Sequence, residues 1–224
     1  MKTAIVIVAG GKGTRMGTDV PKQFLSLCDK PVLMHTIELF YKVLKDVQIV
    51  LVLPIIHQEY WAMLCKDYNF TIKHSITTGG ASRFASVKNG LKKLTNDVLY
   101  IGVHDAVRPL VAEEVILNTY ALAKKYPAVI PCVDVDDSLR IVNADGNKHV
   151  DRSVYKRVQT PQVFQASILL KGYQQNESDR FTDDASVVEN IGYPIFITEG
   201  NTENIKITRP SDLLLAESFL NQQL

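Results

Sequence analysis

The residues best suited to chemistry stand near the start of the chain, where cations follow a glycine-rich stretch. Gly10, Gly11 and Gly13 come directly after an apolar run, and Arg15 and Lys22 follow shortly afterwards. Glycines let backbone N–H groups approach an anion without interference from a Cβ atom, and neighbouring cations neutralise its charge. The pattern therefore predicts a loop that binds phosphate groups.

Two common phosphate-binding motifs do not fit this loop. The Walker motif needs Ser or Thr directly after Gly-Lys, whereas Gly13 follows Lys12. The dinucleotide fingerprint G-x-G-x-x-G requires its third glycine where Met16 stands, although Gly17 allows a looser variant. The acid that would bind a ribose after the second predicted strand is also absent, because that strand leads into Pro54. A dinucleotide-dependent oxidoreductase is therefore disfavoured.

The segments that must position the loop alternate between strand and helix patterns. Residues 4–8 are apolar throughout, as expected for a strand buried on both faces. Further strands are predicted at 49–53, 70–76, 98–103 and 128–133, and helices at 32–44, 58–66, 82–93 and 113–125. This alternation predicts an α/β fold with a mainly parallel twisted sheet flanked by helices, which binds ligands at the carboxyl ends of its strands.

Residues 134–157 follow a different pattern. Polar and apolar residues alternate on both sides of the turn signal Asp145-Gly146, which favours a hairpin. We predict a β-arm that stands off the sheet, and because an isolated hairpin is marginally stable in water, we expect a second subunit to cover it. Helices at 166–174, 184–190 and 211–221 and strands at 194–198 and 205–208 are predicted to complete the fold.

The composition narrows the class of protein. The chain has 224 residues, with 25 Lys and Arg against 24 Asp and Glu, so the formal net charge is +1. This balance offers no basic excess for nucleic acid, and no apolar stretch approaches the roughly 20 residues that span a bilayer. The three cysteines, Cys28, Cys65 and Cys132, predict reduced thiols rather than a disulfide framework. We expect one cytoplasmic domain over residues 1–224, without nucleic-acid or membrane partners.

Five motifs follow one another along the chain: Gly10-Gly11-x-Gly13-x-Arg15-Met16 with Pro21-Lys22-Gln23, Gly79-Gly80-x-x-Arg83-x-x-Ser86, His104-Asp105-Ala106-Val107-Arg108-Pro109, Gln159-Thr160-Pro161-Gln162 and Asn204-Ile205-Lys206-Ile207-Thr208. Each is moderately specific. In this order they resemble the cytidylyltransferase family that acts on 2-C-methyl-D-erythritol 4-phosphate in the non-mevalonate isoprenoid pathway. The resemblance implies a Rossmann-like nucleotidyltransferase fold with a protruding β-arm.

The reaction that this resemblance implies is the attack of a substrate phosphate oxygen on the α-phosphorus of CTP, with release of pyrophosphate. It needs no protein nucleophile, so positioning and charge neutralisation dominate. By resemblance, Arg15 and Lys22 grip the triphosphate, Lys206 lies near the α-phosphate and the incoming phosphate, and Arg152 binds the incoming phosphate. Because Arg152 belongs to the arm, the neighbouring subunit of a homodimer is expected to complete the site.

The remaining candidates bind nucleotide or acceptor. The nucleotide-binding set is Ala9, Gly10, Gly11, Gly13, Gly79, Gly80, Ser86 and Ala106. The set for the polyol phosphate is Asp105, Arg108, Thr160 and Thr182. Mg²⁺ is expected to bridge the phosphates, and Asp105 meets either this metal or a substrate hydroxyl. Arg108 is structural if it pairs with an internal carboxylate, and His104 is expected to be a packed, hydrogen-bonded histidine.

Two other activities share parts of the pattern. Ribitol-5-phosphate cytidylyltransferases have a similar glycine loop. The pair Gly10-Gly11 makes the loop of this chain more similar to theirs. Asp151-Arg152 and the segment around Thr182 favour methylerythritol phosphate, although Asp184 replaces a Glu there. A nucleotide-binding module without catalysis is disfavoured because it need not keep all four cations.

Overall fold

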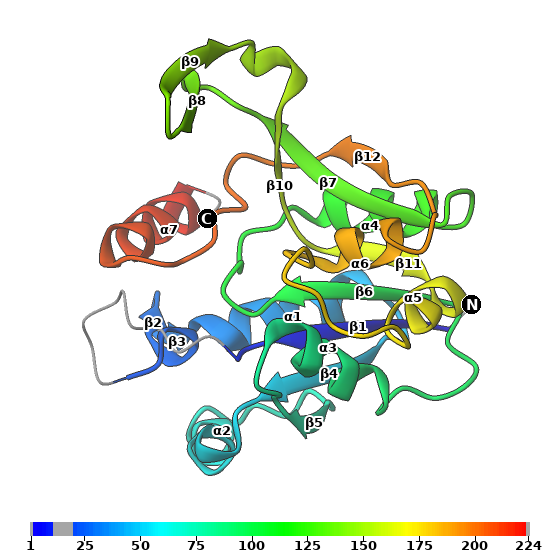
Figure 1. Ribbon diagram of the computed structural model, residues 1–224. Helices are drawn as coiled ribbons and strands as arrows, with labels where there is room; N and C mark the ends of the chain where they lie inside the picture. The colour runs from blue at the N-terminus through cyan, green and yellow to red at the C-terminus, as the bar shows by residue number, and fades with distance from the viewer. Residues whose placement is uncertain (1, 11–19, 223–224) are drawn as a thin grey trace.

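The computed structural model describes residues 2–10 and 20–222. Its centre is a sheet built on β1 (Thr3–Val8), which lies between β6 (Tyr100–Asp105) and β4 (Gln48–Leu53) and runs parallel to both. Strand β5 (Ser75–Thr78) pairs in parallel with β4 at the edge (Figure 1). The uninterrupted apolar sequence of β1 suits this central position, because both of its faces are covered.

The other half of the sheet contains antiparallel pairs. Strand β11 (Gln162–Gln165) lies between β6 and β7 (Ala128–Asp134) and is antiparallel to both. Strand β10 (Lys156–Val158) is antiparallel to β7, and β12 (Phe196–Glu199) is parallel to it. The predicted mixed α/β fold with a mainly parallel sheet is confirmed, with β11 as the antiparallel strand that brings the 159–161 turn beside β6.

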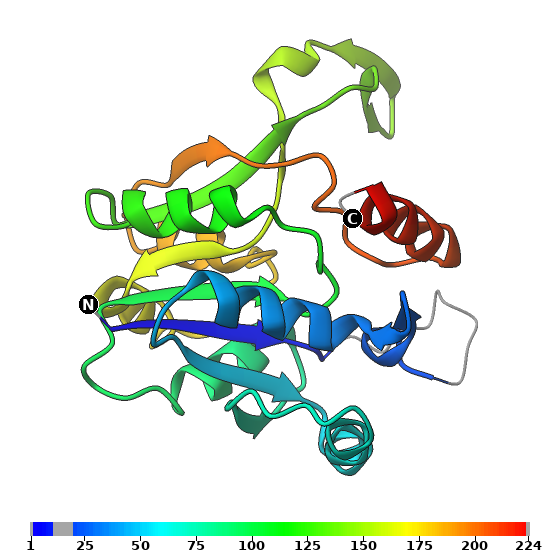
Figure 2. The same ribbon diagram turned by 180° about the vertical axis from the view of Figure 1, so that it is seen from behind.

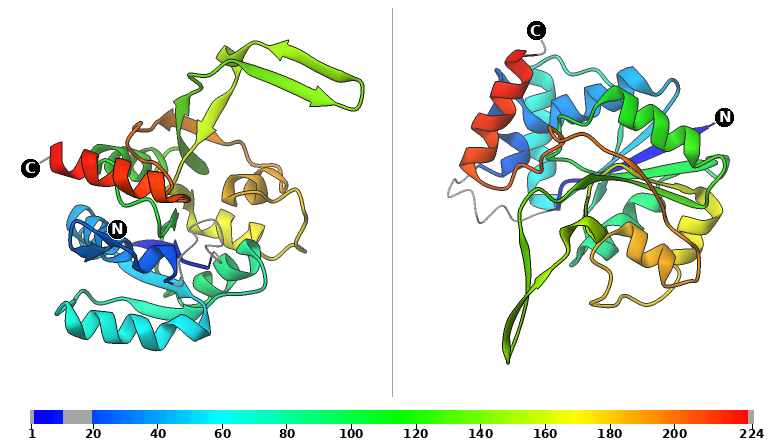
Figure 3. Two further views of the ribbon diagram at one scale, coloured as in Figure 1. Left: turned by 90° about the vertical axis from the view of Figure 1, so that its left-hand side faces the viewer. Right: turned by 90° about the horizontal axis from the view of Figure 1, so that it is seen from above.

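Helices cover both faces of the sheet (Figure 3). Helices α1 (Val32–Val43) and α4 (Glu113–Leu122) pack on one face, whereas α3 (Arg83–Leu91), α5 (Ala166–Gly172) and α6 (Asp184–Glu189) pack on the other. Helix α2 (Ile55–Asp67) follows β4, and the last helix, α7 (Pro210–Gln222), packs against the short strand β2 (Ser26–Leu27). No helix in the described part of the chain has the length and apolar character needed to cross a membrane.

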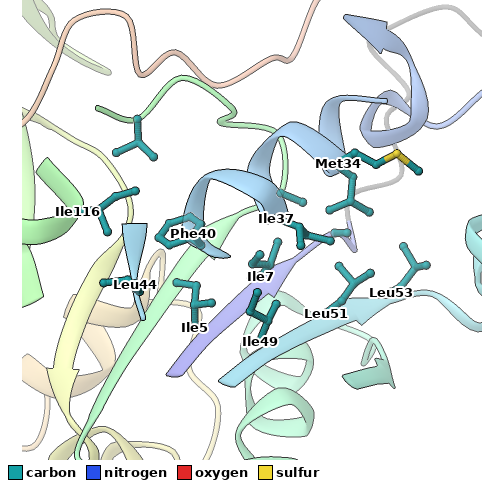
Figure 4. Packing of buried hydrophobic residues seen from close by; sticks show 14 of the residues in the cluster. Ile5, Ile7, Met34, Ile37, Phe40, Leu44, Ile49, Leu51, Leu53 and Ile116 are labelled. Carbon is teal, nitrogen blue, oxygen red and sulfur yellow. The ribbon is translucent and has the colours of Figure 1, made fainter. Parts of the chain in front are cut away.

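Alternation along β1 divides the core between these two layers. Ile5 and Ile7 point to the face covered by α1, where Phe40 meets them, as Figure 4 shows. Ala4 and Val6 point to the opposite face. Successive side chains of a strand point to opposite sides, so one apolar run serves both halves of the core and holds the carboxyl end of β1 in place.

The segment between β7 and β10 forms the predicted arm. Strands β8 (Leu139–Asn143) and β9 (Gly146–Val150) pair with each other and with no other described strand, and Figures 1 and 2 show them standing off the sheet. Gly146 sits in the turn with φ of +126°, a conformation that L side chains rarely adopt. The single-turn helix η3 (Arg152–Val154) leads back to β10.

The predicted elements need correction at four points. The strand predicted at 205–208 is wrong: no strand forms there, although the Ile207 amide donates to the Val107 carbonyl at 2.9 Å. The third strand begins at Ser75, later than predicted. Strands β10 and β11 were not predicted, because their polar residues gave no clear two-residue pattern. The short elements η2 (Lys22–Phe24), β2 (Ser26–Leu27) and β3 (Lys30–Pro31) also lie outside the prediction.

Candidate active site

A cavity of about 350 Å³ lies at the carboxyl ends of β1 and β6, the position at which open α/β sheets bind ligands. Its lining comes from five separate segments of the chain. The lining residues are Val8, Ala9, Gly10, Lys22, Gln23, Gly80, Ala81, Ser82, Arg83, Ser86, Asp105, Val107 and Lys206. Three cations and one carboxylate stand in this lining, so the described wall favours anionic ligands.

The end of β1 and the turn η2 form one wall. The Ala9 amide donates to the Val52 carbonyl at 2.9 Å, and the Gln23 side chain donates to the Ala9 carbonyl at 3.3 Å. The Lys22 side chain is buried, and its ammonium group donates to the Ile207 carbonyl at 3.1 Å. This contact joins the beginning of the chain to the segment that carries Lys206.

The Gly-Gly pair after β5 forms a second wall. The Gly80 amide donates to the Ser86 hydroxyl at 3.0 Å, and Ser82 caps α3 by accepting from the Ala85 amide at 3.0 Å. A Cβ atom at Gly80 would lie 2.4 Å from the Cβ of Ala85, so only glycine fits there. At Gly79 the same atom would meet Ser86 at 3.4 Å, an ordinary contact. The tight turn therefore aims Ser86 at the cavity.

Asp105 ends β6 and gathers two cations. Its Oδ2 atom lies 3.1 Å from both the Lys206 ammonium and the Arg108 guanidinium. Burial by itself raises the pKa of Asp105, but Lys206, Arg108 and Arg83 outweigh burial and hold that pKa well below its ordinary value. The carboxylate is therefore charged across the physiological range and can orient Lys206.

Arg83 is a lining residue that was absent from the predicted site. It begins α3, and its guanidinium binds the fully buried carboxylate of Asp184 in α6. Burial by itself lowers the pKa of Arg83, but Asp184 outweighs burial and raises it. The signal was present in the sequence, since Arg83 follows the Gly79-Gly80 pair at the start of a predicted helix.

His104 is packed and hydrogen-bonded, as predicted. It is fully buried, its ring lies 4.7 Å from that of Phe40, and its two nitrogens contact Thr160 and the Arg108 carbonyl. Burial lowers the pKa of His104 to about 4, so the imidazole is neutral at physiological pH.

The structure divides the predicted residues into two groups. Those that meet at the cavity are Ala9, Gly10, Lys22, Gly80, Ser86, Asp105 and Lys206. Those outside its lining are Gly79, Ala106, Arg108, Thr160, Thr182 and Arg152. Gly11, Gly13 and Arg15 lie outside the described residues.

Several residues of the second group have structural contacts. The buried Ala106 donates its amide to the Val8 carbonyl at 3.1 Å, and the Arg108 guanidinium is held by Asp105 and by the Asn204 carbonyl at 2.7 Å. Arg108 thus makes the internal pairing expected of a structural role. Thr182 is exposed just before α6.

Arg152 lies on the arm, in η3, where its guanidinium donates to the Asp136 carbonyl. Its side chain is exposed and does not reach the cavity of its own chain. Any contact of this residue with substrate must therefore involve another copy of the chain or a rearrangement of the arm.

The described residues hold no group of three His, Cys, Asp or Glu side chains able to cage a metal ion. Asp105 is the carboxylate in the cavity lining, and its described partners both contact Oδ2. Mg²⁺ commonly binds through one or two carboxylates together with substrate phosphates and water. A single lining carboxylate, that of Asp105, is compatible with a metal held in this way.

A second cavity, of about 490 Å³, lies at the base of the arm. Four of its charged side chains pair with one another, since Lys156 contacts Asp134 and Arg157 lies 3.0 Å from Asp136. These pairs are largely exposed, and none of the predicted catalytic residues lines this cavity. We therefore place the chemistry in the cavity at the ends of β1 and β6.

Comparison with known proteins gives a consistent result. The family model for 2-C-methyl-D-erythritol 4-phosphate cytidylyltransferase matches residues 3–222. The chain is 51% identical over 220 residues to the protein of that name from Bacteroides thetaiotaomicron, covering 98% of this chain and 100% of the relative. A relative of the same name from Porphyromonas gingivalis is 49% identical over 220 residues, covering 98% of each chain.

Solved structures agree with the sequence relatives. The crystal structure of 4-diphosphocytidyl-2C-methyl-D-erythritol synthase from Anaerococcus prevotii superposes with a TM-score of 0.83 at 25% identity, covering 98% of this chain and 96% of that one. The 2-C-methyl-D-erythritol 4-phosphate cytidylyltransferase from Thermus thermophilus gives a TM-score of 0.80 at 27% identity, covering 99% and 100%.

Proposed function

The chain belongs to the 2-C-methyl-D-erythritol 4-phosphate cytidylyltransferase family, and from that premise we propose how its residues carry out the reaction. The enzyme joins CTP to 2-C-methyl-D-erythritol 4-phosphate, forming 4-diphosphocytidyl-2-C-methyl-D-erythritol and pyrophosphate for isoprenoid synthesis. A phosphate oxygen of the acceptor attacks the α-phosphorus of CTP, the new P–O bond forms, and the bond to pyrophosphate breaks.

One observation carries the assignment of roles: Lys22, Arg83 and Lys206 converge on one cavity from segments far apart in the sequence. The reaction brings two anions together and accumulates negative charge at the α-phosphate and the leaving group. Fixed cations that face this charge lower the barrier, and removal of one preorganised contact of this kind commonly costs about a hundred- to a thousandfold in rate. The attacking phosphate is already ionised, so no protein base is needed.

We assign the triphosphate to the side of the cavity formed by Lys22. Its buried ammonium group is held beside Gly10 and the end of β1, where backbone N–H groups can donate to an anion without Cβ interference. Arg15 follows the same glycines, and its role in gripping the triphosphate rests on the family resemblance. The Gly80–Ser86 turn, which forms the second wall, is suited to the cytosine edge, because it offers a hydroxyl and close backbone approach.

Lys206 is assigned to the α-phosphate and the incoming phosphate. Its side chain is 42% exposed, so the ammonium group can reach ligand while it remains tied to Asp105. Mg²⁺ held by Asp105 would add charge neutralisation between the phosphates. Thr160 and Arg108 stand behind Asp105 rather than at the cavity, and we assign them to its positioning.

Arg152 is assigned to the incoming phosphate of the neighbouring subunit in a homodimer. It is exposed on an arm whose strands pair only with each other among the described strands. Ile141, Val142 and Val154 on this arm are 55%, 75% and 75% exposed, and a second copy would bury them. Free cysteines and the composition support a cytoplasmic location for this enzyme.

The acceptor assay tests the activity directly. Purified protein is supplied with CTP, Mg²⁺ and either 2-C-methyl-D-erythritol 4-phosphate or ribitol 5-phosphate, and pyrophosphate release is followed. We expect rapid release with the methylerythritol substrate and much slower release with ribitol 5-phosphate. Faster release with ribitol 5-phosphate would move the enzyme to the other acceptor class.

A further inference from the structure

Residues that do not line the cavity, among them the buried Thr160 and His104, form a set of hydrogen bonds around Asp105. We propose that Thr160 and His104 are positioning residues for the reaction, which fix the Asp105 carboxylate and, through it, the ammonium group of Lys206. We call this pair the Thr160–His104 brace. The inference rests on the proposed function, because it requires Lys206 to act on the phosphates.

The hydroxyl group of Thr160 is the centre of the brace. It accepts a hydrogen bond from the backbone amide of Asp105 at 3.2 Å and lies 3.0 Å from Nδ1 of His104. A hydroxyl has one proton to donate, and that proton is directed to Nδ1 because the amide can only donate. Thr160 therefore links the backbone of the catalytic carboxylate to a buried ring.

The other nitrogen of His104 determines its tautomer. Nε2 lies 3.0 Å from the backbone carbonyl of Arg108, which can only accept, so Nε2 carries the proton. The neutral ring then leaves Nδ1 free to accept from Thr160. Both directions of hydrogen bonding are consistent, and His104 joins the end of β6 to the turn that follows it.

Arg108 closes the set of contacts. Its guanidinium donates to Oδ2 of Asp105 at 3.1 Å and to the Asn204 carbonyl at 2.7 Å, while the Asn204 side chain donates to the Thr160 carbonyl at 2.9 Å. Asp105 is thus held at its backbone amide by Thr160 and at its carboxylate oxygen Oδ2 by Arg108. A carboxylate with that restraint offers Lys206 one defined partner.

Lys206 needs such a partner because of where it lies. It belongs to a segment without strand or helix, and its side chain is long and partly exposed. A lysine in that setting loses rotamer freedom when it is fixed, so an unrestrained Asp105 would leave the ammonium group spread over several positions. The brace restrains the backbone of Asp105 and Arg108 restrains its carboxylate, and together they prevent this.

The test is a double-mutant cycle between Thr160 and Lys206. Thr160→Val removes the hydroxyl and keeps the shape, and we expect kcat to fall about 10- to 100-fold, as for loss of an outer partner of a catalytic group. Thr160→Ser should recover most of that loss. In a Lys206→Met background, Thr160→Val should cost little more, because the group that it positions is already gone. If the two losses multiply instead, Thr160 does not act through Lys206.

Two further measurements separate this inference from its alternatives. Thr119→Val removes another fully buried hydroxyl, in α4, and should leave kcat unchanged. Nitrogen-15 NMR of the wild-type ring should show the Nε2–H tautomer of His104, and an Nδ1–H tautomer would overturn the brace whatever the kinetics. A wild-type enzyme without pyrophosphate release, or a Lys206→Met variant with full activity, would instead overturn the proposed function.

Discussion

At the scale of single residues, the site is a charge arrangement rather than a set of reactive groups. Three lining cations face one carboxylate, and that carboxylate is already engaged by Lys206. Ion pairs of this kind are sensitive to the loss of one partner, because the remaining charge is left without compensation in a partly buried position. Asp105 therefore both orients Lys206 and limits the excess positive charge before substrates bind.

Replacement of Lys22 tests this arrangement at the triphosphate. We expect Lys22→Ala to lower kcat/KM by about a hundred- to a thousandfold, because one preorganised cation is lost where charge accumulates. The thermal midpoint should change far less, because the hydrogen bond from the ammonium group to the Ile207 carbonyl is replaceable by water, whereas the charge that faces the triphosphate is not. Steady-state kinetics and thermal unfolding on the same preparation measure both quantities.

Lys42→Ala is the matched control for that variant. Lys42 is exposed on α1 and pairs with Glu113, away from the cavity, so its loss should leave kcat/KM unchanged. If Lys22→Ala lowers stability as severely as activity, Lys22 is a structural residue and its assignment to the triphosphate is wrong.

At the scale of elements, loops at the ends of β1, β5 and β6 supply most of the site. Parallel strands bring their carboxyl ends to one edge, so residues separated by many positions in the sequence become neighbours. The antiparallel strand β11 adds a second contribution, because the turn before it carries Thr160 to the end of β6. Lys206 arrives on an irregular segment that the Ile207 amide ties to Val107.

The Gly79-Gly80 turn offers a test at this scale. Gly80→Ala places a Cβ atom 2.4 Å from that of Ala85, against backbone as well as side chain, so the turn and the start of α3 must shift. We expect a destabilisation of about 1–3 kcal/mol, together with a rise in KM for CTP. Denaturant unfolding and kinetics with varied CTP measure the two effects.

Gly79→Ala serves as the comparison for stability. Its added atom would make an ordinary contact of 3.4 Å with Ser86, so the free energy of unfolding should fall clearly less than for Gly80→Ala. Equal losses for the two variants would contradict the close packing that we assign to Gly80.

At the scale of the whole molecule, the arm is the feature that a single chain leaves unexplained. It stands off the sheet in Figures 1 and 2, exposes Ile141 and Val142, and carries Arg152 away from the cavity of its own chain. In a homodimer in which each arm reaches the other subunit, the partner would cover the exposed apolar residues and Arg152 would lie near the partner's cavity. Symmetric pairs are the commonest assemblies of identical chains.

Subunit mixing tests this assembly. Arg152→Ala and Lys22→Ala should each be nearly inactive alone, but each hybrid dimer would contain one site with both cations intact if Arg152 acts on the partner. Random reassociation should then restore about a quarter of the wild-type activity. A co-expressed pair with two different affinity tags, purified through both, isolates the hybrid.

Two outcomes would count against the dimer. If hybrids stay as inactive as the parents, Arg152 does not complete the partner's site. A fully active monomer at micromolar concentration by light scattering would likewise remove the arm from the mechanism, and the exposed residues would need another partner.

Patterns that depend on neighbouring residues could be predicted well from the sequence. The apolar run of β1, the helical spacing of α1 and the Asp145-Gly146 turn specify their elements locally, and the structure confirms each. The strand at 205–208 was predicted wrongly because β-branched residues favour strands, whereas in the fold Ile207 belongs to a small core cluster and makes a single strand-like contact. The burial of Ile207 depends on Ala216 of α7 and on residues such as Leu27 and Val107, which are distant from it in the sequence.

The class of fold and the family followed from the sequence, because they depend on residue types at short spacing and on the order of motifs. The phosphate-binding loop stays a prediction, since residues 11–19 lie outside the described residues. Only the tertiary structure decided that Arg83 lines the cavity, that Arg108 is held internally and that Thr160 and His104 stand behind Asp105. These assignments rest on distances between segments brought together by strand order and burial. Short-range spacing carries no information about such distances.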